Sequence, residues 1–208
     1  MGAEAYLPAE VEDLMALRAA ARECRGCELF ARATATVFGE GPVGAPLLLV
    51  GEQPGDREDR TGEPFVGPAG QLLDEALRRA GIERGDVYLT NAVKHFKWAP
   101  AASGSRRLHK RPSSREVAAC APWLKAEIAA VAPRLVVCLG ATAAQSLLGA
   151  GLRVSERRGE VIESPGGPPI TVTVHPSSIL RGPPEQRATL LDAFVADLVV
   201  ASAYAPIA

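Results

Sequence analysis

Five short segments rich in aliphatic and β-branched residues alternate with stretches of helical spacing, and this alternation limits the folds open to the chain. Short, continuously apolar runs are typical of strands buried on both faces, as in parallel sheets that helices cover. The segments are PLLLV (46–50), VYLTNAV (87–93), LVVCLG (135–140), EVIES (160–164) and ITVTV (170–174). We therefore expect a mainly parallel central sheet.

Helices are predicted between these segments. Residues 9–22 place Val11, Leu14 and Leu17 at helical spacing, and Gly81 would end a helix over 69–80. Ser113 and Glu116 have the spacing of a capping box, which predicts a helix from there to about residue 131. Two further helices are expected over 141–149 and 184–203. Together the elements predict a three-layer α/β/α sandwich in a single domain, residues 1–208.

Polar residues follow several predicted strands at the point where each strand ends. GEQPG (51–55) comes after the first strand, Asn91 ends the second, and His175 follows TVTV. Ligands bind beyond the carboxyl ends of the strands in such sheets. We therefore expect Glu52, Asn91 and His175 to gather at one rim, within reach of His109.

The overall charge of −1 hides two segments of opposite sign. From Lys94 to Arg115 there are seven Lys or Arg residues and no acid, whereas Glu52 to Glu63 contains five acids and two arginines. The basic segment includes SGSRRLHKRPSS (103–114), which places a histidine among cations. Such a loop suits DNA phosphates. A merely solvated loop is the alternative.

Three of the four cysteines are candidate metal ligands. Cys24 and Cys27 form a CxxC pair, whose spacing suits one metal or cluster and also a redox-active pair. Cys120 is the better third ligand, because Cys138 lies in an apolar strand, and His95 is a candidate fourth ligand. The start of the chain has neither a basic region nor an apolar signal core, so we expect a cytoplasmic protein without a membrane span or structural disulfides.

Several motifs, in order, resemble the iron–sulfur uracil-DNA glycosylases of family 4. They are CxxC, FGEGPVGAPLLLVGEQPGDREDRTGEPFVGPAGQLLD, YLTNAVK, CAPWL, LGATAA and VTVHPSSILR, and they extend from about residue 24 to 182. Two features depart from family 4: His95 stands where its members carry cysteine, and the basic loop is inserted. GEQPG, NAVKH and RRLHK are similar to the UdgX branch, whose members excise uracil and become covalently attached to the abasic site. That branch reads KRRIH where this chain reads Ser105-Arg106-Arg107-Leu108-His109.

The resemblance implies a uracil-DNA glycosylase-like fold and a set of catalytic roles. His109 would attack C1′ of the deoxyribose, and Glu52 would orient or deprotonate its ring. His175 would donate a hydrogen bond to the uracil oxyanion. Phe65 would stack on the flipped base and Asn91 would pair with its edge. The implied base-binding residues are Gln53, Gly55, Asp56, Phe65 and Asn91.

The resemblance also implies a cofactor and a partner. A [4Fe–4S] cluster would be held by Cys24, Cys27, His95 and Cys120, with tetrahedral zinc as the runner-up. The partner would be uracil-containing DNA, single-stranded, with double-stranded DNA left open, bound by a monomer associated with the nucleoid. The implied phosphate contacts are Arg106, Arg107, Lys110, Arg111 and Arg181.

Two other functions remain open at this point. One is conventional hydrolytic excision of uracil, with His109 binding phosphate and Glu52 guiding water. The other is a non-enzymatic, metal-stabilised module that binds uracil-containing DNA. A nucleotide-binding domain is disfavoured, because GEQPGD lacks both the dinucleotide fingerprint and the P-loop lysine.

Overall fold

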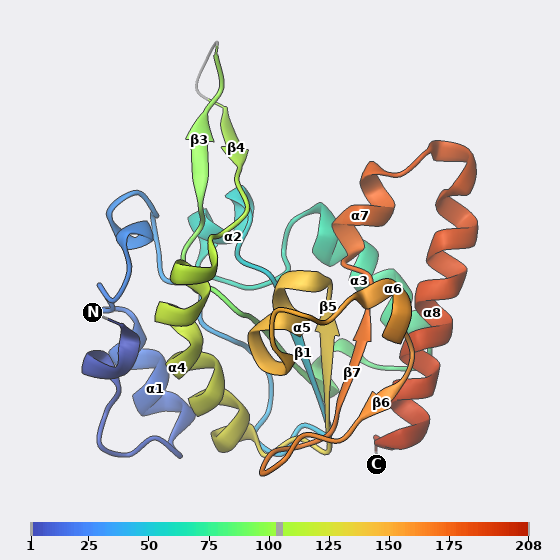
Figure 1. Ribbon diagram of the computed structural model, residues 1–208, viewed down its shortest axis with the longest axis horizontal. Coiled ribbons are helices and arrows are strands. Elements are labelled where there is room, and N and C mark those ends of the chain that lie inside the picture. The colour runs from blue at the N-terminus through green and yellow to red at the C-terminus, as the bar shows by residue number, and fades with distance from the viewer. Residues whose placement is uncertain (1, 103–105, 208) are drawn as a thin grey trace.

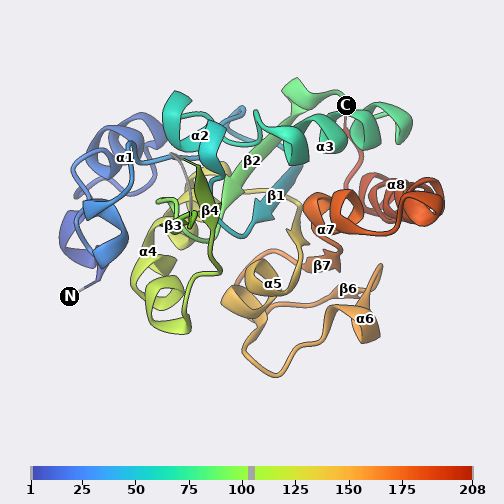
Figure 2. The ribbon, with the colours of Figure 1, turned by 90° about the horizontal axis from the view of Figure 1, so that it is seen from above.

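In a computed structural model of the chain, which describes residues 2–102 and 106–207, five strands form one central sheet. The sheet has the order β2-β1-β5-β7-β6, and its neighbours run parallel except for β6, which is antiparallel to β7 (Figure 1). The strands are β1 (Leu47–Gly51), β2 (Val87–Asn91), β5 (Leu135–Leu139), β6 (Val161–Ile162) and β7 (Ile170–Thr173). Helices lie on both faces, so the predicted three-layer sandwich is confirmed (Figure 2).

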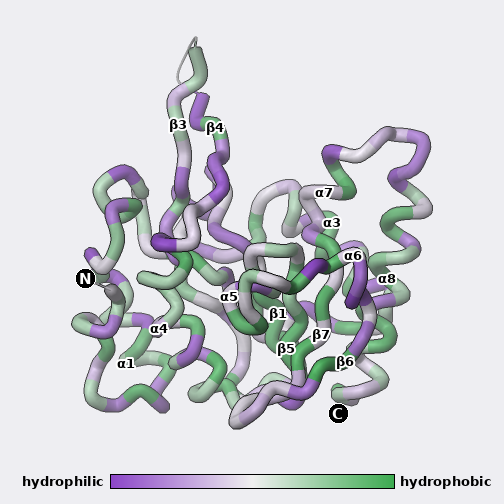
Figure 3. Tube along the Cα trace, in the orientation of Figure 1, coloured by the Kyte–Doolittle hydropathy of each residue, from purple (hydrophilic) through white to green (hydrophobic). Residues whose placement is uncertain are grey.

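The two faces of the sheet bury different helices. Successive residues of a strand point to opposite faces. Leu47 and Leu49 accordingly pack in one cluster with residues of α3 and α8, whereas Leu48 and Val50 pack in another with residues of α4 and α5. Hydrophobic residues are concentrated along these central strands (Figure 3). The helices are α3 (Pro68–Arg79), α4 (Ser114–Val131), α5 (Ala141–Leu148) and α8 (Arg187–Tyr204).

The cap residues set where the first helix and α4 begin. The capping box predicted before α4 is present: Glu116 N–H donates to Ser113 Oγ at 3.3 Å, and Ser113 N–H donates to Glu116 Oε2 at 2.6 Å. The helix predicted over 9–22 is shorter, α1 (Leu14–Ala21). The helix begins later than predicted because the Asp13 carboxylate accepts N–H groups of the first turn. Asp13 is therefore the N-cap, and the helix starts at the next residue.

The main difference from the prediction is the basic loop. Part of it forms a two-stranded antiparallel hairpin, β3 (Trp98–Pro100) and β4 (Arg107–His109), which stands out from the body of the molecule (Figure 1). Ser105 of the quoted RRLHK comparison lies outside the described residues. His109 is thus a strand residue, paired with Trp98, and not a loop residue.

Several short elements complete the fold. Three further α-helices are α2 (Asp56–Thr61), α6 (Val154–Arg157) and α7 (Pro176–Arg181). The 3₁₀ helices are η1 (Ala3–Tyr6), η2 (Glu28–Ala31), η3 (Arg84–Asp86) and η4 (Pro184–Gln186). The helix predicted over 184–203 is therefore divided into η4 and α8. Over residues 2–102 and 106–207, no helix combines the length and the apolar character that a bilayer span needs.

Candidate active site

A cleft of about 1090 Å³ opens at the carboxyl ends of the parallel strands. It brings together residues from the 51–55 turn, the end of β2, the hairpin and the start of α7, as the rim rule predicts. The residues proposed from sequence that line it are Glu52, Gln53, Gly55, Asp56, Phe65, Asn91, His109, Arg111, His175 and Arg181.

Asn91 and Phe65 lie against Gly51, where any side chain would collide with both. A Cβ on Gly51 would lie 2.4 Å from Asn91 Oδ1 and 2.7 Å from Phe65 Cζ. Phe65 itself has a φ of 56°, an unfavourable left-handed conformation for a bulky residue, and its side chain is buried. Strained backbone of this kind persists where the surrounding structure imposes it, often at active sites. The amide and the aromatic ring are therefore held side by side in one arrangement.

His175 presents one defined nitrogen to the cleft. Its Nδ1 accepts a hydrogen bond from Ser177 N at 3.1 Å, and Ser177 Oγ lies 2.8 Å from the same atom. Burial, with a smaller effect from Arg181, lowers the pKa of His175 to about 4. The ring is thus neutral near pH 7, and since Nδ1 is an acceptor, the proton resides on Nε2. His175 is therefore a hydrogen-bond donor through Nε2.

Gln53 determines which nitrogen of His109 carries a lone pair. Gln53 Oε1 accepts Lys97 N–H at 3.0 Å, which orients the amide group. Its Nε2 then donates to Lys110 O at 3.0 Å and lies 2.9 Å from His109 Nε2. His109 Nε2 must accept from this donor, so Nδ1 carries the proton. The Gln53 side chain also ties both ends of the hairpin to the 51–55 turn.

His109 is accessible, and its surroundings favour the neutral form of the ring. Its side chain is 48% exposed, and its Nε2 lies 3.8 Å from Glu52 Oε1. Burial of the ring lowers the pKa of His109 below its ordinary value, although Glu52 acts in the opposite direction. A neutral imidazole is a competent nucleophile through its one ring lone pair, which here lies on Nε2 against the Gln53 amide.

Glu52 is held by Thr142, a residue that received no role from the sequence. Thr142 Oγ1 donates to Glu52 Oε2, and Arg111 Nε donates to Thr142 Oγ1 at 3.3 Å. Oε1 is left facing His109. The sequence contained a signal for this role: Thr142 lies in the first turn of α5, directly after β5, and that helix begins at the same rim.

The predicted phosphate ligands fall into two groups. Arg111 and Arg181 line the cleft, and Arg106 and Lys110 are exposed on the hairpin. Arg107, in contrast, pairs through Nε with Asp56 and through NH1 with Asp59 at 2.6 Å, and its side chain is 11% exposed. Its guanidinium group is thus already engaged by two carboxylates, which argues against the phosphate contact predicted for it.

Asp56, predicted to bind the base, also has another set of partners. Its carboxylate accepts from Arg107 and, at 3.1 Å, from Arg60. Burial acts to raise the pKa of Asp56, but the guanidinium groups of Arg107 and Arg60 together outweigh it and hold the pKa below its usual value. In this structure Asp56 lines the cleft while it binds the hairpin.

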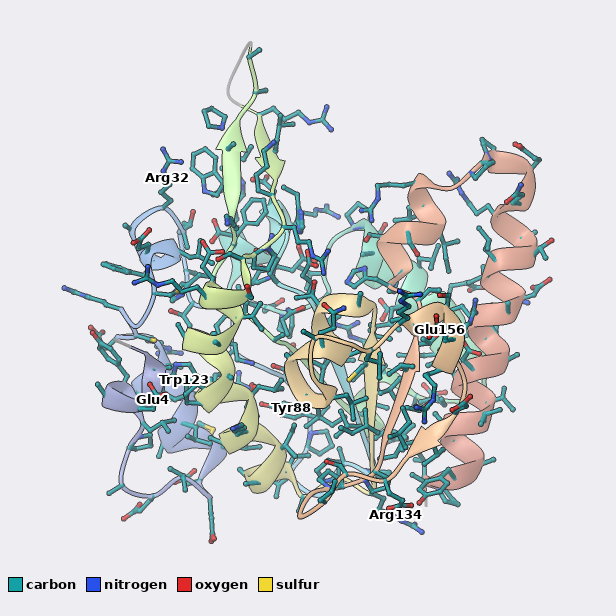
Figure 4. All side chains as sticks on the ribbon, in the orientation of Figure 1. Glu4, Arg32, Tyr88, Trp123, Arg134 and Glu156 are labelled. Carbon is teal, nitrogen blue, oxygen red and sulfur yellow. The ribbon has the colours of Figure 1, made fainter. Side chains whose placement is uncertain are left out.

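The cysteines predicted as metal ligands share one apolar cluster at the N-terminal side of α4. Trp123 Nε1 donates to Cys24 Sγ at 3.2 Å (Figure 4), and Lys94 N–H donates to Cys120 Sγ at 3.3 Å. Burial raises the pKa of Cys120 to about 12, with smaller raising effects from Cys27 and Cys24. The sulfurs are therefore neighbours that accept N–H donors, a pattern that suits iron–sulfur ligation.

His95, the predicted fourth ligand, lies against a hydroxyl group in this structure. Its Nε2 lies 2.9 Å from Thr36 Oγ1, and burial lowers the pKa of His95 to about 4. Across residues 2–102 and 106–207, no three His, Cys, Asp or Glu side chains are arranged to hold a metal ion. Cys24, Cys27 and Cys120 thus share one apolar cluster, whereas the His95 imidazole lies against the Thr36 hydroxyl group.

Comparisons with known proteins agree with the geometry of the cleft. A family model described as the uracil DNA glycosylase superfamily matches residues 38–199. The chain is 41% identical to the type-4 uracil-DNA glycosylase of Thermotoga maritima over 77% of this chain and 79% of that protein. For the type-4 enzyme of Pyrobaculum aerophilum the identity is 37%, over 82% and 86%. The type-5 uracil-DNA glycosylase of the same organism is 34% identical, over 67% and 64%. This chain belongs to the uracil-DNA glycosylase superfamily.

Proposed function

We propose that this protein excises uracil from DNA and that His109 then becomes covalently attached to C1′ of the abasic deoxyribose. One observation carries the proposal: the accessible imidazole of His109 stands at the mouth of the cleft that also contains Asn91, Phe65 and His175. The similarity to type-4 uracil-DNA glycosylases supports the excision step.

The cleft would act first on an extruded nucleotide. Taking a base out of the stack costs a few kcal/mol, and less in single-stranded DNA. Asn91 carries both a donor and an acceptor for the uracil edge, and the rigid ring of Phe65 offers a stacking surface. The backbone of the turn at Gln53 and Gly55 closes the pocket on the other side.

Cleavage of the N-glycosidic bond sends its electron pair to the uracil ring. The sugar becomes an oxocarbenium ion, and negative charge develops on the uracil oxygen. His175 Nε2–H donates to that oxygen, and a donor of this kind contributes roughly 10²–10³ in rate. Because the ring is neutral, its Nε2–H is a weak acid, and it donates this hydrogen bond without giving up the proton.

The covalent step follows from the position of His109. A ring lone pair attacks C1′, a C–N bond forms, and the ring becomes an imidazolium ion. This ion loses the proton on its other nitrogen, and the departing uracil takes up one proton, so the overall charge is unchanged. Glu52 is the carboxylate beside Nε2 and would orient the ring and stabilise the positive charge of the imidazolium ion, whose Nδ1 proton passes to solvent. Proximity gives the imidazole its advantage over water.

Conventional hydrolytic excision is the second candidate, and the similarity to type-4 uracil-DNA glycosylases supports it equally. In that case water would attack C1′ and Glu52 would guide it, while His109 would bind DNA. The two candidates share the base pocket and differ in the fate of the sugar.

We also propose that DNA is held by cations around the mouth of the cleft. Arg111 and Arg181 line the cleft, and Arg106 and Lys110 point from the hairpin. Contacts of this kind make binding fall steeply with salt concentration. The expected DNA is single-stranded, because no unpairing cost then applies.

A structural [4Fe–4S] cluster is proposed from the neighbouring thiols of Cys24, Cys27 and Cys120, with zinc as the alternative. Bound, it would join the N-terminal segment to α4. No step of the reaction passes through it. Iron, sulfide and zinc analysis of the purified protein distinguishes the two metals.

The proposed trapping is tested with a labelled single-stranded oligonucleotide that contains one uracil. Wild-type protein should give a band, stable to heat and detergent, shifted by the mass of the protein. His109→Ala should lose this band while the protein remains folded and still binds the oligonucleotide. A shifted band that survives in His109→Ala contradicts the assignment of the nucleophile. Strand cleavage after alkali, without a shifted band in wild type, supports hydrolytic excision instead.

A further inference from the structure

The hairpin that carries His109 is attached to the body through a second residue of the same strand. In β4, Arg107 and His109 are two positions apart, so their side chains leave the same face of the strand. Both contact Phe96: the Arg107 guanidinium lies 5.4 Å from the ring centroid, and the ring of His109 lies 5.9 Å from it. A displacement of Arg107 would therefore be transmitted to His109 through the strand and through this ring.

Arg107 makes contacts in several directions. Besides Asp56 and Asp59, it donates to Thr34 Oγ1 at 3.2 Å and to the Asp56 carbonyl at 3.3 Å. The Trp98 ring of the opposite strand lies 5.4 Å from the guanidinium and also contacts Arg32. The Arg107 side chain is 11% exposed, whereas the side chain of Arg111 at the rim of the cleft is 64% exposed. Arg107 is thus built into the protein, whereas Arg111 is open to solvent.

Asp59 is the fixed end of this attachment. Its side chain is fully buried, and its carboxylate also accepts Thr34 N–H at 2.9 Å and Ala35 N–H at 3.5 Å. Three segments therefore meet on one carboxylate: the 34–35 loop, α2 and the hairpin. Several hydrogen bonds to a buried carboxylate hold its position closely.

The Gln53 contacts and the Asp59 contacts fix different parts of the hairpin. Gln53 binds the backbone at Lys97 and Lys110, at the base of the two strands. Arg107 lies farther out, beyond His109 on β4. Held at the base alone, the strand could still pivot and move the imidazole relative to the cleft.

We propose that Arg107 and Asp59 are positioning residues, which hold His109 at the mouth of the cleft so that it captures the sugar before water does. The inference rests on the proposed function. Excision itself would depend on Asn91, Phe65 and His175, which lie on other elements. The positioning pair should thus control the partition of the oxocarbenium ion between imidazole and water, and not its formation.

The test compares two products in one reaction. Wild-type and variant proteins in excess are mixed with the uracil oligonucleotide, and both covalent adduct and free abasic DNA are measured over time, together with released uracil. For Arg107→Gln the ratio of adduct to free abasic DNA should fall about 10- to 100-fold, since small displacements of a reacting group cost up to about 10²-fold. Uracil release should stay within about twofold. Arg107→Lys, which retains a cation for Asp59, should recover part of the ratio.

Arg60→Gln is the matched control. Arg60 also pairs with Asp56, at 3.1 Å, but it belongs to α2 and is exposed. Its variant should keep the wild-type ratio. Asp59→Asn should lower the ratio as Arg107→Gln does, but it changes a buried carboxylate and can fail to fold. Asp56→Asn changes only the exposed carboxylate that pairs with Arg107, so it should fold and give a milder fall in the ratio.

Three results would overturn the inference. An unchanged ratio in Arg107→Gln and Asp56→Asn would show that His109 needs no such support. Parallel losses of uracil release and adduct, with a weaker salt dependence of binding, would make Arg107 a phosphate ligand. Uracil release without adduct in wild type would overturn the proposed trapping as well, which separates that failure from the first two.

Discussion

The neutral state of His175 has a consequence for stability in acid. The pKa of His175 is lowered to about 4, chiefly by burial, whereas a histidine in the unfolded chain titrates near 6.5. The unfolded state therefore binds more protons between these values, and the free energy of unfolding falls as the pH decreases through this window. The contribution is present above pH 6.5 and is lost progressively toward pH 4.

The magnitude follows from the two pKa values. Between pH 7 and pH 5, linkage gives a loss of about 2 kcal/mol from this one group. His175→Gln removes the titration and can still accept the Ser177 N–H, so its stability should fall less over the same range, by about that difference.

The assay is urea unfolding of wild type and His175→Gln at pH 7 and pH 5, followed by circular dichroism. Other titrating groups are common to both proteins and cancel in the comparison. Equal losses of stability would refute the reasoning, because they would mean that the His175 ring is already charged in the folded state or is not buried from solvent. A charged ring would also change the kind of donor offered to uracil.

Two more substitutions test the geometry of the cleft. Gly51→Ala should reduce uracil release by at least about 100-fold, because its Cβ would collide with Asn91 Oδ1 and the Phe65 ring. Single-turnover uracil release measures this effect, and a near-normal rate would mean that neither side chain contacts the base. Thr142→Val removes the donor to Glu52 and should slow adduct formation about 10-fold with uracil release nearly unchanged. A rapid-quench time course separates the two steps, and equal slowing of both would instead place Glu52 in bond cleavage.

The sheet and the gathering of the site followed from the sequence because both depend on local pattern. Apolar runs identified the strands, and the rim rule then placed Glu52, Asn91 and His175 together without any measured contact. The thiols of Cys24 and Cys120 were also expected near one another. In each case a short segment carries the information.

The hairpin was not predicted because contacts with distant segments, and not its own sequence pattern, stabilise it. RLH in β4 has no apolar alternation, and its strand is fixed by Gln53 and Asp59 from distant segments. The basic composition of the hairpin indicated phosphate binding. Arg107 instead pairs with Asp56 and Asp59, which belong to the acidic segment that no sequence pattern placed beside it. The short helix α2, DREDRT, likewise lacks an apolar face that could have revealed it.

Acidic and amide side chains between Glu52 and Asp59 contact β4 of the hairpin. Glu52 and Gln53 contact His109, while Asp56 and Asp59 hold Arg107. The position of the hairpin thus depends on contacts with a segment that is far away in the chain. Transfer of the hairpin alone to a related scaffold would leave His109 and Arg107 without these partners, so an engineered version must carry both segments together.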